Sequence, residues 1–245
     1  MTSTSTRPES VGSGVRIGVV TIGQTPRTDL TPELARHLPG AEIVERGVLD
    51  GLSAAQIHEL APQAGEHVLT TRLRDGGSAV IGEGSVMDRL PAVIRELEAD
   101  VDAVLLACTG PFPNIDHRRP LFVPDRIIAH AIGAAATAGE PVGIIAPLPE
   151  QVEDTTRKFD AVLRGSSAVH VTACSPYTGT TSELRRAGRA LAEDGARLLA
   201  MDCFGYTADM RRIVAEETGL PVIVARSIAA RLAAEALGLE GTAVS

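Results

Sequence analysis

The stretch Val101-Asp-Ala-Val-Leu-Leu-Ala-Cys-Thr-Gly110 is an apolar run that ends in a cysteine and a turn containing glycine. A second stretch, Arg197-Leu-Leu-Ala-Met-Asp-Cys-Phe-Gly205, has the same form. Short apolar runs that end in turn residues are typical of buried strands. Each stretch therefore predicts a strand that carries one thiol, that of Cys108 or Cys203, at its carboxyl end.

Around these two stretches, short β-branched runs alternate with longer helical patterns. We expect strands over 16–21, 41–47, 67–73, 78–82, 101–107, 141–146, 168–173, 197–201 and 221–224, and helices over 28–38, 53–60, 85–99, 125–138, 151–163, 181–194, 210–218 and 227–237. Thr31 and Ser53 are expected helix caps, and Arg74-Asp-Gly-Gly77 predicts a hairpin turn. The alternation predicts an α/β fold with mostly parallel sheets covered on both faces.

The chain also contains a weak internal repeat. Similar runs open at Gly18 and Gly143, 125 residues apart, and similar runs end at Cys108 and Cys203, 95 residues apart. A hairpin region over 66–83 without a counterpart would supply most of the difference of 30 residues. We interpret the repeat as two related α/β halves, with chance similarity between apolar strands as the alternative.

Composition narrows the class of partner. The chain has 245 residues, with 23 Lys and Arg against 31 Asp and Glu, a net charge of −8 that argues against nucleic acid binding. No apolar run approaches the length of a membrane span. Residues 1–14 are rich in Ser, Thr and Gly and are interpreted as a disordered tail. Three widely spaced cysteines, an odd number, favour a reducing, cytoplasmic setting over a disulfide scaffold.

Metal and cofactor chemistry finds little support in the sequence. No CxxC or HxxxH pair is present, so we expect no metal site. Lys158 is the single lysine and lies in a polar helical stretch, which argues against pyridoxal chemistry.

The two strand-end cysteines carry the functional hypothesis. Open α/β sheets bind ligands at the carboxyl ends of their strands, so facing halves would place both thiols beside one cleft. Two groups of similar acidity on opposite sides of one carbon can remove a proton from one face and return a proton to the other. The alternative is that both thiols are small buried apolar groups. Cys174 has no such partner, and we interpret it as structural.

Three motifs, in order, carry a family resemblance: Gly23-Gln-Thr-Pro-Arg27, Leu106-Ala-Cys-Thr-Gly-Pro-Phe112 and Met201-Asp-Cys-Phe-Gly-Tyr206. They resemble the AroM family of the aspartate/glutamate racemase superfamily, over about residues 16–239. The resemblance implies two pseudo-symmetric three-layer α/β domains with an active-site cleft between them, a mechanism without cofactor, and Cys108 and Cys203 as the catalytic pair. The domains would span 15–115 plus 207–240 and 116–206. Asp202 stands where racemases of the superfamily commonly have glycine.

Further residues are candidates for substrate binding. Gln24, Thr25 and Arg27 could hold a carboxylate, or form a helix-entry turn with a solvent-facing arginine. Ser85 could bind an anion at a helix start or act as a plain N-cap. The remaining candidates follow the two cysteines, where hydroxyl groups and glycine amides could bind substrate oxygens or satisfy the loops: Thr109, Gly110, Gly205, Tyr206 and Thr207.

Together these features predict a cofactor-independent racemase- or isomerase-like enzyme that moves a proton at the α-carbon of a small carboxylic acid. The loop amides would stabilise the enediolate-like anion. A decarboxylase or cis–trans isomerase in the same cleft, with one cysteine as nucleophile, and a non-catalytic metabolite-binding protein are the alternatives. The expected partner is a small-molecule carboxylate, with no nucleic acid and no membrane. The sequence leaves a homodimer open.

Overall fold

The computed structural model describes residues 14–239, so the tail predicted for residues 1–14 lies almost entirely outside the described residues. The strands are β1 (Arg16–Thr21), β2 (Glu42–Gly47), β3 (Val68–Arg72), β4 (Ser78–Gly82), β5 (Ala103–Leu106), β6 (Leu121–Phe122), β7 (Val142–Ala146), β8 (Val169–Ala173), β9 (Leu198–Met201) and β10 (Val222–Val224). The helices are α1 (Thr31–His37), α2 (Ala54–His58), α3 (Glu83–Met87), α4 (Leu90–Leu97), α5 (Pro124–Ala135), α6 (Val152–Leu163), α7 (Thr181–Glu193), α8 (Ala208–Thr218) and α9 (Ala225–Ala236), with a 3₁₀ turn, η1, at Pro149–Gln151.

Two four-stranded parallel sheets have the same topology. The first has the order β2-β1-β5-β6, and the second, read in the same direction, has the order β8-β7-β9-β10. The strand that ends before Cys108, β5, therefore corresponds to β9, which ends before Cys203. The predicted α/β fold with two related halves is confirmed.

Each sheet is the middle of three layers. The first sheet packs α4 and the β3–β4 hairpin on one face and α1 and α9 on the other. The second sheet packs α7 and α8 on one face and α5 and α6 on the other. The strands are buried on both faces because helices cover both, which explains why β5 and β9 are apolar at every position.

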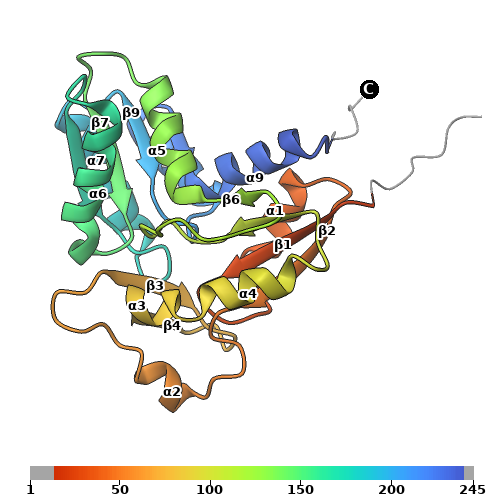
Figure 1. Ribbon diagram of the computed structural model, residues 1–245. Helices are drawn as coiled ribbons and strands as arrows, with labels where there is room; N and C mark the ends of the chain where they lie inside the picture. Colours follow the sequence, from red (N-terminus) through yellow and green to blue (C-terminus); the bar gives the residue numbers. More distant parts are fainter. Residues whose placement is uncertain (1–13, 240–245) are drawn as a thin grey trace, which may run out of the picture.

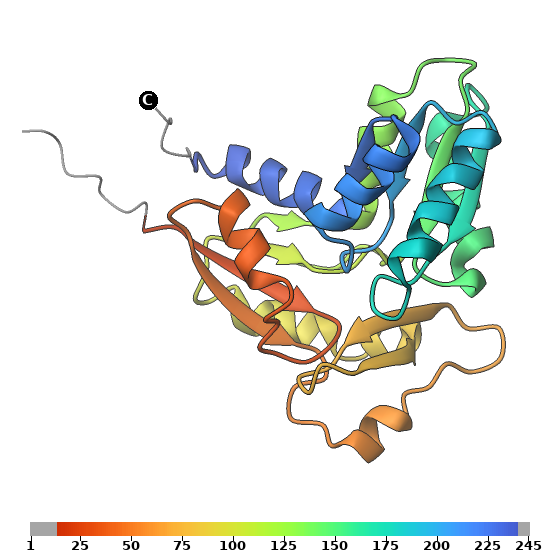
Figure 2. The ribbon, with the colours of Figure 1, turned by 180° about the vertical axis from the view of Figure 1, so that it is seen from behind.

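The two halves exchange helices. Helix α5 follows β6 of the first sheet but packs on the second sheet beside α6. Helix α9 follows β10 of the second sheet but lies along α1 on the first sheet (Figures 1 and 2). The exchange ties the halves together through two buried helix faces.

Sheet membership differs from the predicted domain boundaries at two strands. β10 was expected in the first domain but pairs with β9 in the second sheet. β6 was expected in the second domain but pairs with β5 in the first sheet. Both strands are short, and each pairs with the strand that directly precedes it in the sequence.

The β3–β4 hairpin has no counterpart between β8 and α7. Its strands pair antiparallel, and the Leu73 N–H donates to the Gly77 carbonyl at 2.8 Å, as the Asp-Gly turn predicts. The capping box at Ser53 is also confirmed. The hairpin is therefore an insertion in the first half, with α2 in the segment that leads to it (Figure 1).

Two helix-start predictions are wrong. Thr31 is the first residue of α1 rather than its cap, because its hydroxyl donates to the Arg27 carbonyl and to Glu45. The helix expected over 85–99 is two helices, since Pro91 lacks the N–H that a continuous helix would donate to the Met87 carbonyl. Ser85 therefore lies inside α3, whose N-cap is Gly82.

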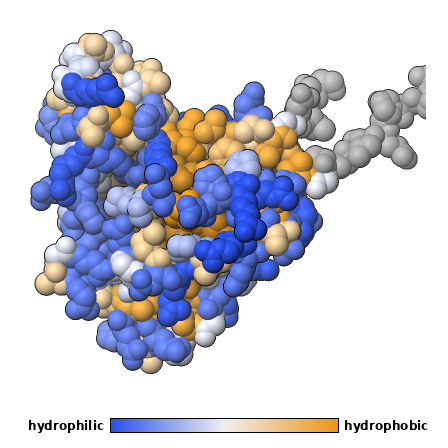
Figure 3. Space-filling model, viewed as in Figure 1, coloured by the Kyte–Doolittle hydropathy of each residue, from blue (hydrophilic) through white to orange (hydrophobic). Residues whose placement is uncertain are grey.

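The surface is largely hydrophilic on the face shown in Figure 3, with apolar residues gathered around α9 and β6. Leu232 of α9 is one of two large apolar side chains of the described chain that are strongly exposed. Within residues 14–239, every helix is too short or too polar to cross a membrane.

Candidate active site

The two cysteine loops have the same local geometry. Cys108 follows β5, and the Gly110 N–H donates to its Sγ at 3.3 Å. Cys203 follows β9, and the Gly205 N–H donates to its Sγ at 3.3 Å. In each loop the amide two residues on thus approaches the sulfur, which would stabilise a thiolate there.

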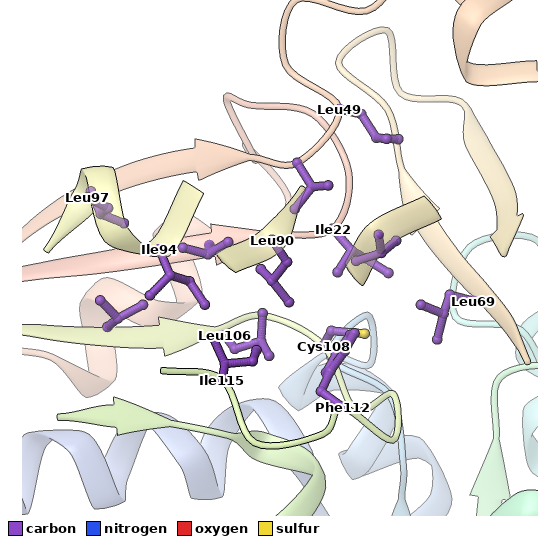
Figure 4. Packing of buried hydrophobic residues seen from close by; sticks show 14 of the residues in the cluster. Ile22, Leu49, Leu69, Leu90, Ile94, Leu97, Leu106, Cys108, Phe112 and Ile115 are labelled. Carbon is purple, nitrogen blue, oxygen red and sulfur yellow. The ribbon is translucent and has the colours of Figure 1, made fainter. Parts of the chain in front are cut away.

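Both cysteines line one small cavity of about 20 Å³, hereafter the cysteine cavity. Its floor is the end of the first apolar core, where Cys108 lies near Phe112 (Figure 4). Three consecutive residues of β3, Leu69, Thr70 and Thr71, also line it. The volume holds about one water molecule, so the described state is closed to a carbon-based ligand.

The thiols are weak acids in this closed state. Burial raises the pKa of Cys108 to about 12, and the Gly110 amide opposes the shift only in part. Burial also raises the pKa of Cys203 to about 11, against the Gly205 amide and the guanidinium groups of Arg226 and Arg27. Both sulfurs are therefore protonated at neutral pH, and Cys203 is the easier one to ionise.

Of the candidate substrate-binding residues, Thr109 and Gly110 line the cysteine cavity. The Thr109 hydroxyl donates to the Asp202 carbonyl at 3.1 Å, which ties the two cysteine loops together. Gly205 lies directly against Tyr177, since a Cβ placed on it would come within 2.8 Å of the Tyr177 hydroxyl oxygen.

The other candidates in the first half do not line the cavity, although Arg27 lies close enough to act on Tyr177 and Cys203, which do. Arg27 is buried and holds Asp29 through two 2.8 Å hydrogen bonds, so the expected solvent-facing or carboxylate-binding guanidinium is already paired. The Thr25 hydroxyl donates to Asp50 at 2.6 Å. Gln24 accepts from the Arg74 N–H at 3.2 Å. Ser85 is not among the residues that line the cysteine cavity.

Two of the three candidates after the second cysteine, Tyr206 and Thr207, stabilise the fold. Tyr206 is fully buried, and its hydroxyl bonds to the carbonyls of Cys174 and Ala146, at 2.5 and 3.0 Å. Thr207 is the N-cap of α8 and accepts from the Met210 N–H at 3.2 Å.

The structure adds residues that sequence reasoning missed. Tyr177 and Gln151 line the cysteine cavity together with Thr70 and Thr71. Burial raises the pKa of Tyr177 well above its ordinary value, so its hydroxyl remains a neutral donor. Tyr177 follows β8 and Gln151 follows β7, so both lie after strands whose carboxyl ends meet at the cavity. That position was the signal that could have identified them.

The single lysine of the chain lies beside this cavity rather than on a polar surface. Its Nζ forms an ion pair with Asp125 at 2.9 Å and a second ion pair with Asp202. Burial lowers the pKa of Lys158, but the two carboxylates raise it by more, so the ammonium stays charged. Burial raises the pKa of Asp202, and Lys158 opposes that shift.

A buried arginine holds the second cysteine loop from the opposite side. Arg226 of α9 has no exposed surface and donates to the carbonyls of Phe204 and Gly205, at 2.8 and 3.1 Å. It also pairs with Glu33 of α1 at 3.0 Å. The exchanged helix α9 therefore connects the Cys203 loop to the first half.

The β3–β4 hairpin closes the cavity against the second half. The Gln151 side-chain amide donates to the Val68 carbonyl at 2.8 Å. His67 pairs with Asp154 of α6. The Arg72 guanidinium lies 5.0 Å from the centre of the Tyr177 ring. All three contacts cross from the hairpin to the second half.

Comparison with known proteins settles the family. The family model described as AroM protein matches residues 17–237, nearly the whole chain. The chain belongs to the AroM family. Both cysteine loops of this AroM chain lie within the matched residues. No curated protein matches it.

Solved structures of a glutamate racemase and a maleate isomerase have the same fold as this AroM chain. A glutamate racemase from Bacillus anthracis aligns with a TM-score of 0.56 at 16% identity, covering 93% of this chain and 83% of that chain. The maleate isomerase of Pseudomonas putida S16, crystallised with maleate, aligns with a TM-score of 0.54 at 14% identity, covering 92% of each chain. At these identities the likeness establishes the fold of the AroM chain.

Proposed function

We propose that the protein is a cofactor-independent racemase- or isomerase-like enzyme that acts on a small carboxylic acid. Cys108 and Cys203 would form its acid/base pair. One sulfur takes the α-proton as a thiolate, and the opposite thiol returns a proton to the other face of the carbon. The single observation that carries the proposal is that both strand-end thiols line one cavity.

The pseudo-symmetry of the halves supports this pairing. The two thiols follow corresponding strands of two sheets with one topology, and each accepts a backbone N–H two residues further on. A buried cysteine that only fills space needs neither feature.

The lower pKa of Cys203 favours this thiol over Cys108 as the base before substrate binds. Burial is the largest cause for both thiols and leaves the pKa of Cys203 at about 11 and that of Cys108 at about 12. Each sulfur also has a nearby carboxylate that raises its pKa and a cationic side chain that lowers it. Because both pKa values lie above 9.0, turnover should rise with pH through the alkaline range as Cys203 ionises. The sequence had suggested that the loop amides stabilise a substrate enediolate. The Gly110 and Gly205 amides already contact sulfur, so they would support a thiolate instead.

The substrate carboxylate would be held by other groups than those expected from the sequence. The hydroxyl-bearing residues Thr70, Thr71, Thr109 and Tyr177 all line the cavity. They would replace Thr25, Arg27 and Thr207, whose polar groups are engaged elsewhere. Entry of the substrate would require the β3–β4 hairpin to move, since the closed cavity holds about one water.

Solvent exchange tests the proposal. The protein is incubated in D₂O with a panel of small carboxylic acids, and loss of the α-proton signal is followed by NMR. The expected result is exchange with at least one acid, abolished by Cys108→Ser and by Cys203→Ser. Cys174→Ser is the matched control, because Cys174 is also buried but lies outside the cysteine cavity.

The same panel separates the alternatives. Release of CO₂ from a malonate would indicate a decarboxylase in this cavity. Conversion of a cis acid to its trans isomer without exchange of an α-proton would indicate a cis–trans isomerase. Binding of an acid with unchanged affinity in both serine variants and no turnover would instead indicate a metabolite-binding protein.

A further inference from the structure

A groove of about 530 Å³ opens on the second half of the molecule. Its walls are the loop after β7, the end of β8 with the loop that follows it, and one face of α7. We call it the α7 groove. Open α/β sheets bind ligands at the carboxyl ends of their strands, and the volume is within the range of small-molecule sites, about 300–1,000 Å³. The cysteine cavity, at about 20 Å³, is far smaller.

The α7 groove is distinct from the cysteine cavity, with which it shares one lining residue, Pro147. The loops after β7 and β8 place Leu148 and Ser175 in the groove. Further along, the same loops place Gln151 and Tyr177 in the cysteine cavity. The substrate-binding candidates from the sequence all lie outside the groove, so the proposed function leaves it without a role.

Three arginines of α7 differ in their partners. Arg185 and Arg189 both form ion pairs with Glu217 of α8. Arg186 lines the α7 groove, and within residues 14–239 its guanidinium has neither an ion pair nor a hydrogen bond. A guanidinium offers five N–H donors and no acceptor, so this free group favours a ligand that carries an anion.

The hydroxyl group of Ser175 can only donate to a ligand in the groove. Its oxygen accepts the N–H groups of Tyr177 and Thr178, both at 3.2 Å. These two bonds use the acceptor capacity of the oxygen and leave its proton for the groove. Thr172 and Thr178 bring further hydroxyl groups to the lining.

Among the described residues, Glu183 is the one acid that lines the groove. Its Oε2 accepts from the Thr180 N–H and hydroxyl, at 2.8 and 2.9 Å, in the capping box of α7. The carboxylate is thus held at the start of the helix, while Arg186 remains unpaired. Much of the remaining lining is apolar, for example Leu148, Pro149 and Ala187.

We propose that the α7 groove binds a small organic anion with a carboxylate or phosphate head and an apolar body. The head accepts from Arg186 and Ser175, and the body packs against Leu148. The proposal goes beyond the proposed function and does not rest on it, because the groove and the cysteine cavity have almost separate linings.

Four probes test which part of a ligand the groove recognises. Benzoate and phenyl phosphate have an anionic head and an apolar body, benzyl alcohol has the body without charge, and inorganic phosphate is the head alone. Calorimetry gives the dissociation constants. At least one of the two organic anions should bind about ten-fold more tightly than benzyl alcohol and inorganic phosphate, and the tighter one identifies the head group. The bound anion should also slow iodoacetamide labelling of Cys174, which lines the groove.

Two variants of opposite sign assign the binding to the groove. Arg186→Met, at an exposed position, should weaken the anion about ten-fold. Glu183→Gln keeps a side chain that can form the capping box but removes its charge, so it should tighten binding about two- to three-fold. Arg211→Met, exposed on α8 outside the groove, is the matched control and should leave binding unchanged. Cys203→Ser should also leave it unchanged, because Cys203 lines only the cysteine cavity of the two.

The outcomes keep this site apart from the cysteine pair. Anion binding that survives Arg186→Met, or that disappears in Cys203→Ser alone, would overturn the proposal and place the anion elsewhere, in the second case at the cysteine cavity. Equal affinity for benzyl alcohol and both organic anions, or no binding of any probe, would overturn it as well. Loss in Arg186→Met together with protection of Cys174 would support it, whether or not any acid exchanges its α-proton.

Discussion

The loops after β5 and β9 share a backbone geometry but differ in what surrounds them. Around Cys108 the neighbours are largely apolar, with Leu69 and Phe112 against Gly110. Around Cys203 the neighbours are charged, with Arg226 on the loop carbonyls and Asp202 paired to Lys158. Pseudo-symmetry thus fixed the position of the thiols, while the differing surroundings gave the two sulfurs different acidities.

That asymmetry matters for a two-thiol mechanism. If both thiols had the same surroundings, neither would be favoured as the base before substrate arrives. Here burial raises the pKa of Cys203 to about 11 and that of Cys108 to about 12, so Cys203 is the easier thiol to ionise. Four predictions test the contrast between the two loops, beginning with the largest effect.

Arg226→Met should have the largest effect, because it removes the charged anchor that only the Cys203 loop has. The carbonyls of Phe204 and Gly205 and the Glu33 carboxylate would lose a buried donor. The free energy of unfolding should fall by about 3–5 kcal/mol in chemical denaturation. Arg231→Met on the exposed face of α9 is the control and should change it by less than about 0.5 kcal/mol. Equal losses in both variants would contradict an anchoring role.

Gly205→Ala should cost more than Gly110→Ala. A Cβ at Gly205 would come within 2.8 Å of Pro176 and of the Tyr177 ring, whereas one at Gly110 would first meet the end of the flexible Leu69 side chain, also at 2.8 Å. We expect losses of stability of about 1–3 kcal/mol for the first and below about 1 kcal/mol for the second. Thermal unfolding of the two variants side by side measures the difference, and the reverse order would show that the Cys108 loop is the tighter one.

The two thiols should ionise about one pH unit apart. The pKa of Cys203 is raised to about 11 and that of Cys108 to about 12, so at any pH below both values Cys203 has about ten-fold more thiolate. Iodoacetamide labelling between about pH 9 and 10, read by mass spectrometry, should therefore modify Cys203 first. Cys108→Ser and Cys203→Ser confirm each assignment. Equal rates would mean that the charged groups around Cys203 do not tune its sulfur.

The smallest effect should come from the contacts that hold the hairpin to the second half. His67→Ala with Arg72→Ala removes the contacts to Asp154 and Tyr177. Because His67 is exposed and Arg72 is partly exposed, stability should change by less than about 1 kcal/mol, but both thiols should be labelled a few-fold faster. His58→Ala with Arg89→Ala, at exposed positions away from the second half, is the control. Unchanged labelling would exclude the hairpin as the route into the cavity.

Much of the fold could be predicted because its determinants are local. The apolar runs before Cys108 and Cys203, and the Asp-Gly turn at residues 75–76, each specify their structure through a few adjacent residues. The helix expected over 85–99 failed at Pro91, where one residue outweighed an otherwise continuous apolar stripe. The sheet to which β6 and β10 belong was not predicted, because a domain boundary was placed between each of these short strands and the preceding strand with which it pairs.

Fewer features of the site than of the fold could be predicted from the sequence. Thr109 and Gly110 were placed correctly at the cavity because they directly follow a strand-end cysteine. The burial of Arg27 was not predicted, because a sequence does not show that Asp29 will accept from its Nε and Nη2 and Thr21 from its Nη1. Lys158 was read as a residue of a polar helix, although its partners, Asp125 and Asp202, come from two other elements.

The sequence by itself determined the alternation of strands and helices, the two strand-end cysteines and the AroM motifs, since these depend on neighbouring residues. Only the tertiary structure decided that the two thiols share one cavity and that β3 covers it. The physical reason is that burial and hydrogen-bond pairing depend on which distant segments meet, and here the meeting was set by the exchange of α5 and α9 between the halves.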